Sequence, residues 1–388
     1  METLARETQP RSVQDLLPAA FQVFFADLGH GSKVKRISVL DKPAGACDAR
    51  SIEKERSFDL RENVMNINQR ALAIGVGAAL LQALMLVAFA WPAANIAPRD
   101  VPIAVTGPQA DLVIGKLTAH SPDAFEISRP GDAAAARAAI EHRAVYGAIV
   151  TGDGPPRVLV ASAASPAVAQ QLTQIGQQLS GGAAAPVEDV VAADADDPRG
   201  AAFGAMVLPL VMSGLAAGVL LSLLIPAFGA KALGLFTFGL VGGLLSMEIV
   251  HGWMSVIPGS YLVLSAVAGL ASFAVAGAVV GLAAVIGRAG IGIAALTLLL
   301  IGNPFSAATS APELLPQPWG AIGQLLPPGA AASLFRSVAY FDGARATGPL
   351  VVLLIWAAAG LALLAVAAFR PRAAAEPTIV TPVPAAVN

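Results

Sequence analysis

Long uncharged stretches dominate the pattern of the chain. The stretches without Asp, Glu, Lys or Arg cover positions 71–91, 203–230, 249–287, 289–312 and 346–369. An apolar helix needs about 20 residues to cross the ~30 Å hydrocarbon core of a bilayer, and most of these stretches are that long. With breaks at proline and glycine, the pattern predicts about six membrane-spanning helices, at 71–91, 203–225, 232–250, 260–286, 289–303 and 348–369.

The segment 92–202 has a different pattern, in which short apolar runs alternate with helical spacing. It predicts strands at 101–107, 125–128, 145–151 and 158–161, and helices at 109–120, 131–143 and 165–179. Asp132 is a candidate N-cap, and Pro166 lies in a first helical turn. This alternation favours a partly parallel sheet, and 181–200 is interpreted as an acidic tether. The fold class is therefore a helical membrane bundle with an extracytoplasmic α/β domain between helices one and two.

Composition and charge support a membrane location and give the orientation. The chain is 56% hydrophobic and 13% charged, against about 25% charged residues in soluble globular proteins. Basic residues flank alternate helix ends, at Arg61, Arg70, Lys231, Arg288, Arg370 and Arg372. Because Lys and Arg concentrate in cytoplasmic loops, both termini are expected in the cytoplasm and 92–202 outside it.

The predicted organisation follows from these points. It comprises a cytoplasmic segment 1–70, helix one at 71–91, the extracytoplasmic α/β domain at 92–202, helices two to five within 203–302, an outer re-entrant or interfacial loop at 303–347, helix six at 348–369 and a cytoplasmic tail at 370–388.

The first 64 residues differ from the rest of the chain. Translation could begin at Met65, directly before helix one, or residues 1–64 could form a cytoplasmic arm or an interfacial helix. Ala88-Phe89-Ala90 has the form of a signal-peptide cleavage site, but the apolar stretch is long and favours a retained anchor. Cys47 is the one cysteine, so an intramolecular disulfide is excluded.

Motifs for catalysis are absent from the sequence. It contains no phosphate-binding loop, no HExxH, no CxxC and no G-x-S-x-G. The four histidines are scattered, which argues against a metal site, and the net charge of −2 suggests no nucleic-acid partner. We expect no catalytic residue, no metal and no cofactor in this chain.

Polar side chains near the predicted helices are candidate functional groups, because they are costly at membrane depth. Glu248 and His251 are spaced by three residues near the outer end of the third helix. One interpretation is a proton- or substrate-contacting pair, and the other is that the helix ends by Met247 and both lie at the wet interface with Trp253. Gln82 in helix one is interpreted as an interhelical hydrogen-bonding residue.

Glycines spaced by four residues occur in three of the predicted helices. Small residues let helix backbones approach closely in lipid. Packing within the chain is favoured over a dimer seam. The pairs are Gly214 and Gly218, Gly239 and Gly243, and Gly277 and Gly281.

The stretch after the fifth helix is apolar but rich in proline and glycine. Such a segment is tolerated near membrane depth only where protein buries it or where it lines a cavity. We interpret it as re-entrant or interfacial pieces that form an outer loop or gate, and an ordinary surface loop is the alternative. Its candidate residues are Asn303, Pro304, Trp319, Pro327, Pro328, Gly329 and Arg336.

The layout of 66–370 resembles the exporter-type (type-two) permease family of ATP-binding-cassette transporters. The resemblance rests on the large domain between helices one and two, the five helices that follow, and the stretches Gly302-Asn-Pro-Phe-Ser and Leu325-Leu-Pro-Pro-Gly-Ala. Phage-infection-protein relatives and uncharacterised actinobacterial membrane proteins rich in Ala and Gly share this layout.

The resemblance implies a partner and an energy source. In that family a separate subunit binds and hydrolyses ATP and docks on the loop between helices two and three, here with Pro226, Phe228 and Lys231. This loop is very short and carries one charge. The resemblance also implies a homodimer in the lipid bilayer.

Three functions are compatible with the sequence. The first is a permease-like exporter subunit that moves a hydrophobic or amphipathic substrate outward. The second is a non-transporting anchored protein whose outer domain binds a peptide, a cell-wall component or a phage. The third is a proton-coupled transporter that uses Glu248 and His251.

Overall fold

The computed structural model describes residues 49–181 and 184–369. The chain divides into two compact units, residues 1–75 and 76–388, and for residues 49–66 only the helical backbone is described. The expectations for 1–48, including Cys47, and for the tail 370–388 lie outside the described residues.

Five helices of the described chain are long and apolar enough to cross a membrane. They lie in α2 (Ala49–Ala94), α6 (Ala201–Leu224), α7 (Phe228–Met247) with its π-helical extension η2 (Glu248–Trp253), α8 (Tyr261–Ile286) and α12 (Thr347–Phe369). The apolar part of α2 runs from Ile67 to Ala94, so it passes Pro92, where the sequence predicted an end.

The fifth predicted helix is shorter than the others. It consists of α9 (Arg288–Leu296) and the π-helix η3 (Thr297–Gly302). At 1.5 Å per residue its 15 residues reach roughly 22 Å, less than the ~30 Å of a bilayer core. Residues 49–181 and 184–369 thus contain five long apolar helices and one shorter apolar helix.

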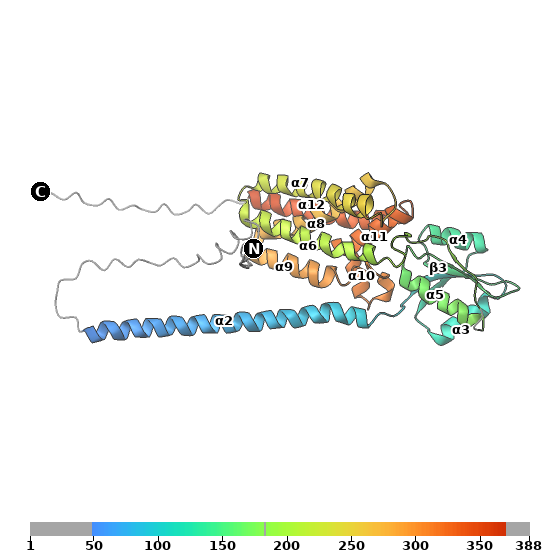
Figure 1. Cartoon of the computed structure of the whole chain (residues 1–388), viewed down its shortest axis with the longest axis horizontal. Coiled ribbons are helices and arrows are strands. Elements are labelled where there is room, and N and C mark those ends of the chain that lie inside the picture. The colour runs from blue at the N-terminus through green and yellow to red at the C-terminus, as the bar shows by residue number, and fades with distance from the viewer. Residues whose placement is uncertain (1–48, 182–183, 370–388) are drawn as a thin grey trace, which may run out of the picture. The chain divides into compact units, whose positions relative to one another are not determined.

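Helix α8 is the centre of the bundle, and α6, α7 and α12 run alongside it (Figure 1). Most of α8 is buried, and it has no charged residue. Glycines make the close approach possible. A Cβ on Gly218 of α6 would lie 2.6 Å from Val279, one on Gly243 of α7 would lie 2.4 Å from the Ser265 carbonyl oxygen, and one on Gly281 would lie 2.7 Å from the Gly360 carbonyl oxygen.

Between α2 and α6 in sequence lies a small mixed sheet, here called the sheet domain (residues 101–189). Its strand order is β2-β1-β3-β4-β5, and only the β3–β4 pair is antiparallel. The strands are β1 (Val101–Thr106), β2 (Phe125–Ser128), β3 (Gly147–Val150), β4 (Arg157–Val160) and β5 (Val187–Asp189). The four predicted strands and the partly parallel sheet are confirmed, whereas β5 lies in the predicted tether.

Helices cover both faces of this sheet (Figure 1). The helices are α3 (Ala110–His120), α4 (Ala133–Glu141) and α5 (Pro166–Leu179), as the sequence predicted. Helices α3 and α5 pack on one face with Val105 and Ile149, and α4 packs on the other with Ala104 and Leu159. Asp132 accepts a hydrogen bond from the Ala135 N–H, which confirms the predicted N-cap.

The segment after η3 folds into short pieces. These are the 3₁₀ turn η4 (Pro312–Leu314), α10 (Trp319–Gln324) and α11 (Pro327–Tyr340). Much of the segment is buried, including Phe305, Leu315 and Phe335, so it is not an exposed surface loop. Ala311 and Leu314 also pack with the α3–α5 face of the sheet domain, so this segment joins the sheet domain to the helices.

Candidate functional site

A cluster of polar side chains connects α11 to neighbouring segments of the chain. It contains Arg143, Tyr146, Glu313 and Arg336, and we call it the junction. Arg336 of α11 is only 4% exposed. Its guanidinium donates hydrogen bonds to the carbonyl oxygens of Ala307 (3.0 Å) and Ala308 (2.6 Å), and it lies 5.0 Å from the ring centroid of Phe203. Burial, and then the nearby charge of Arg143, lower the pKa of Arg336 to about 10, so it remains a cation at neutral pH.

Arg143 reaches the same junction from the sheet domain. It follows α4 in a left-handed conformation, with φ of 54°. The N–H of Arg143 bonds the Ile140 carbonyl and that of Ala144 bonds the Ala139 carbonyl, which is the Schellman ending of a helix. Glycine is usual at this position, so the arginine side chain carries a backbone cost of about 1–2 kcal/mol.

The Arg143 side chain offsets this cost by contacts to α11. Its Nη1 donates hydrogen bonds to the Ser333 carbonyl oxygen (3.2 Å) and to Ser337 Oγ (2.5 Å). It also lies 5.3 Å from the ring centroid of Phe341. Burial lowers the pKa of Arg143. The arginine therefore ties α4 of the sheet domain to α11.

Further bonds complete the junction. Tyr146 donates a hydrogen bond of 2.8 Å to Glu313 Oε2, and burial raises the pKa of the Tyr146 phenol, which keeps it protonated as a donor. Arg99 donates to the Leu314 carbonyl oxygen, and the Ala97 N–H donates to the same oxygen. A cavity of about 270 Å³, here called the junction cavity, is lined by Arg143, Tyr146, Glu313, Arg336 and Arg345 among others.

An apolar groove of about 580 Å³ runs along the helices α7, α8 and α12. Phe236, Phe273 and Leu354 are among its lining residues, and at its floor Gly239 and Gly269 let α7 and α8 approach closely, since a Cβ on Gly269 would lie 2.6 Å from the Gly239 carbonyl oxygen. Its walls therefore suit an apolar ligand.

Among the described residues that line this groove, Ser265 has the one polar side chain. Ser265 is 6% exposed, and its Oγ has no hydrogen-bond partner among the described residues. An unpaired buried hydroxyl costs about 1–3 kcal/mol. The lining of the groove is thus apolar except at one side chain.

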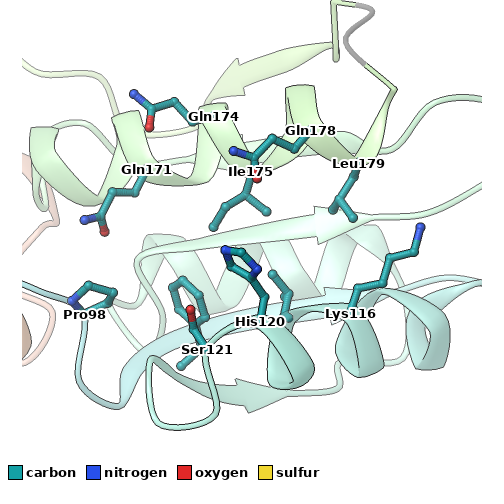
Figure 2. Close-up of a pocket in the computed structure, with 11 residues that line it drawn as sticks. Pro98, Lys116, His120, Ser121, Gln171, Gln174, Ile175, Gln178 and Leu179 are labelled. Atoms are coloured by element: carbon teal, nitrogen blue, oxygen red, sulfur yellow. The ribbon is translucent and has the colours of Figure 1, made fainter.

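A third cavity, of about 420 Å³, lies on the sheet domain between α3 and α5 (Figure 2). Gln171, Gln174 and Gln178 line it from α5, and Lys116 and His120 line it from α3. The Gln171 Oε1 atom is buried and has no hydrogen-bond partner among the described residues. This polar cavity suits a ligand with N–H or O–H donors.

The predicted docking loop is very small in the structure. Residues 225–227 connect α6 to α7, and Phe228 already begins α7. Lys231 is 8% exposed, and its Nζ lies 5.7 Å from the Phe228 ring centroid. Pro226 is exposed. A docking role for these three residues stays a prediction, and the surface they offer is narrow.

Glu248 and His251 do not form a hydrogen-bonded pair. Helix α7 ends at Met247, and both residues lie in η2. His251 Nδ1 lies 2.8 Å from the Ile257 carbonyl oxygen, whereas Glu248 is exposed and its carboxylate has no hydrogen bond to a described residue. Their functional roles stay predictions.

The candidate gate residues lie in a closely packed region. Trp319 stacks on Phe305 with ring centroids 5.5 Å apart. Pro327, Pro328 and Gly329 are buried in the first turn of α11. A Cβ on Gly329 would lie 2.2 Å from the Gly323 carbonyl oxygen, so glycine is required for this contact.

The remaining gate residues lie where η3 ends. Asn303 and Pro304 follow η3 and are partly buried. Together with Arg336, the candidate gate residues therefore gather around α10, α11 and the end of η3.

Sequence reasoning missed Arg143, Gln171 and Ser265. Arg143 could have been noticed in the sequence, because it follows an Ala-rich predicted helix at the position where glycine is usual. The other two had none, because their unpaired state depends on residues from other helices. Among residues 49–181 and 184–369, no group of three or more His, Cys, Asp or Glu could hold a metal ion.

Comparison of the chain with protein-family models, curated proteins and solved structures gives no match. The arguments on function therefore start from the sites themselves.

Proposed function

We propose that this protein is the membrane subunit of an exporter that moves a hydrophobic or amphipathic substrate outward. The observation that carries this proposal is the apolar groove along α7, α8 and α12, in which Ser265 has the one polar side chain among the described lining residues. A strongly polar ligand would gain little binding free energy from an apolar lining, whereas a lipophilic molecule with one polar group would bury its apolar surface there.

The arrangement of the helices supports the proposal. In transporters, interrupted helices and irregular backbone occur at membrane depth where they line a cavity or are buried in protein. Here the short α9–η3 segment leads into the buried pieces around Phe305 and Leu315. We propose that this segment acts as the gate, with both termini in the cytoplasm and the sheet domain outside.

The energy source belongs to the same proposal. This chain would act as a permease of the ATP-binding-cassette type, with ATP used by a separate subunit and with two copies of the chain in the working unit. The narrow loop at 225–227 leaves the end of α8 and Arg288, the first residue of α9, as further contact points for that subunit.

Dye efflux from whole cells tests the proposal. Cells with and without the protein are loaded with ethidium, an amphipathic cation, or with Nile red, a neutral lipophile. We expect faster efflux of at least one dye from the cells that carry the protein. If cells with and without the protein expel each dye at the same rate, export of this substrate class is refuted.

Two matched variants link efflux to the groove. Ala358 and Ala365 are both exposed residues of α12, but only Ala358 lines the groove. Ala358→Phe should abolish the protein-dependent efflux and Ala365→Phe should keep it. The same loss in both variants would contradict a role for the groove.

Inhibitors of ATP synthesis and of the proton gradient distinguish ATP-coupled from proton-coupled transport. Depletion of ATP should stop efflux even while the proton gradient is kept. If efflux instead follows the proton gradient and Glu248→Gln abolishes it, the proton-coupled alternative holds and the ATP-coupled one fails.

A second candidate function is ligand binding by the sheet domain, with the helices as an anchor. The buried and unpaired Gln171 Oε1 in the cavity between α3 and α5 favours it (Figure 2). A peptide or a cell-wall glycan carries the N–H and O–H donors that this oxygen lacks.

Co-sedimentation of the full chain with insoluble peptidoglycan tests the glycan form of this function. Gln171→Leu removes the acceptor and should reduce binding. Gln177→Leu is the control, because Gln177 is an exposed residue of the same helix that does not line the cavity. Equal co-sedimentation of both variants and the wild type would contradict this function.

A further inference from the structure

The junction cavity contains an excess of positive charge. Arg143, Arg336 and Arg345 line it, and Glu313 is the one carboxylate among the described residues of its lining. That carboxylate already accepts the hydrogen bond of Tyr146. The four charged groups therefore leave a net charge of about +2 around the cavity at neutral pH.

No carboxylate within the described ranges neutralises these arginines directly. The ion pairs found within 4.0 Å there are Arg129 with Asp111 and Arg137 with Glu188. Arg336 instead bonds two carbonyl oxygens, which are dipoles without net charge. Burying a cation without a counter-charge costs free energy, and a bound anion would lower that cost.

The guanidinium groups also keep unused donors. Each guanidinium carries five N–H groups. Arg336 and Arg143 each form two hydrogen bonds with described residues, and Arg345 forms none. Donors that remain at the cavity can bond a ligand without breaking the junction.

The backbone at two of the arginines is unusual. Arg143 has φ of 54° and Arg345 has φ of 56°, in the left-handed region that favours glycine. Such conformations cost about 1–3 kcal/mol each and cluster at ligand-binding positions. Both residues line the same cavity, which suggests that their side chains are needed there.

The size and the charge fit one ligand chemistry. The cavity of about 270 Å³ has the volume of roughly nine water molecules, enough for a phosphate group with its first waters. A phosphate monoester carries about −1.5 to −2 charges at pH 7, and the planar guanidinium fork binds it through two parallel hydrogen bonds. We propose that the junction cavity binds the phosphate group of an anionic ligand through Arg143, Arg336 and Arg345.

Two sources could supply that phosphate, and calorimetry on the full chain in detergent separates them. Inorganic phosphate represents the free anion, and dihexanoyl phosphatidic acid, a phosphate monoester, represents a lipid headgroup. Dihexanoylglycerol lacks the phosphate and should not bind at the site. Tighter binding of the short-chain phospholipid than of inorganic phosphate identifies a headgroup site, and the reverse order identifies a free-anion site.

Variants with opposite expected effects test the assignment. Arg345 is exposed and has no hydrogen bond to a described residue, so Arg345→Gln should fold and weaken phosphate binding roughly tenfold. Glu313→Gln removes the one carboxylate while its side-chain oxygen can still accept the Tyr146 bond, so it should tighten phosphate binding. A purely structural junction would give neither shift.

Arg157→Gln is the matched control, because Arg157 is an exposed arginine of the sheet domain that does not line the cavity. It should bind phosphate like the wild type. The proposal is overturned if neither phosphate ligand gives saturable heat, or if Arg345→Gln and Glu313→Gln bind like the wild type. Tighter binding of succinate, a dicarboxylate, than of either phosphate ligand would also overturn the phosphate assignment.

Discussion

Two glycines of α8 give the most quantitative prediction on the helix bundle. Gly277 and Gly281 lie one turn apart, are both buried, and both approach Gly360 of α12. A Cβ on Gly277 would have its nearest contact at 3.8 Å, which is ordinary packing. A Cβ on Gly281 would lie 2.7 Å from the Gly360 carbonyl oxygen and 3.0 Å from its Cα, so α12 would have to move.

The magnitudes follow from these contacts. Replacing glycine by alanine inside a helix gains about 1 kcal/mol of intrinsic helix stability. Overpacking costs about 1–3 kcal/mol. Gly277→Ala should therefore leave the free energy of unfolding unchanged or raise it by up to about 1 kcal/mol, and Gly281→Ala should lower it by up to about 2 kcal/mol.

Titration of the purified protein with SDS in mixed micelles measures this difference. Gly243→Ala extends the series, because its Cβ would lie 2.4 Å from the Ser265 carbonyl oxygen and within 2.9 Å of the Gly269 backbone, and it should be the most destabilising of the three. Equal losses for Gly277→Ala and Gly281→Ala would refute the reasoning. If these glycines formed a dimer seam, the substitutions would change the oligomeric state and leave the unfolding of one subunit unaltered.

Three further predictions concern the polar groups of the structure. Tyr146→Phe removes the hydrogen bond to Glu313 and should lower the free energy of unfolding by about 1.5 kcal/mol; no change in an SDS titration would contradict a structural role for this bond. Trp356→Phe removes the bond from its Nε1 to the Leu325 carbonyl oxygen (2.9 Å) and should cost about 1 kcal/mol in the same assay, so an unaltered midpoint would argue against it. Burial raises the pKa of Tyr340 to about 12, so the folded state keeps its phenol protonated. The stabilisation that comes from this protonated phenol is complete below pH 10 and is lost as the pH rises towards 12. The absorbance of the wild type at 295 nm minus that of Tyr340→Phe should therefore rise with a midpoint near pH 12, and a midpoint near pH 10 would contradict the burial.

The sequence predicted most of the sheet domain, because its elements carry strong local patterns. The strand β1 is almost fully buried, and α5 buries one face at helical spacing, with Pro166 in its first turn. Strand β5 was missed because Val187–Asp189 is short, acidic and largely exposed. It is a strand only because its backbone pairs with β4, and the local sequence has no alternation of apolar and polar residues that would predict this pairing.

The helix bundle was predicted less completely. Apolar length identified the long helices, but 289–303 has the composition of a spanning helix and only 15 helical residues in the structure. The signal fails there because composition does not show where a helix stops and the chain folds back. Arg336 was singled out from the sequence, yet its partners Ala307 and Ala308 lie nearly thirty residues earlier and carry no side-chain signal.

The central claim is that the helix bundle crosses the membrane, with the sheet domain on the outer side and the α6–α7 connection on the inner side. Cysteine labelling of intact cells tests it, in a background where Cys47 is replaced by Ser. Gly152 and Gly229 both have open space around an added Cβ, so Gly152→Cys in the sheet domain and Gly229→Cys at the start of α7 should fold. A membrane-impermeant maleimide should label Gly152→Cys in intact cells and Gly229→Cys only after the membrane is permeabilised. Labelling of both in the same compartment, or recovery of the protein from the soluble fraction without detergent, would contradict the account.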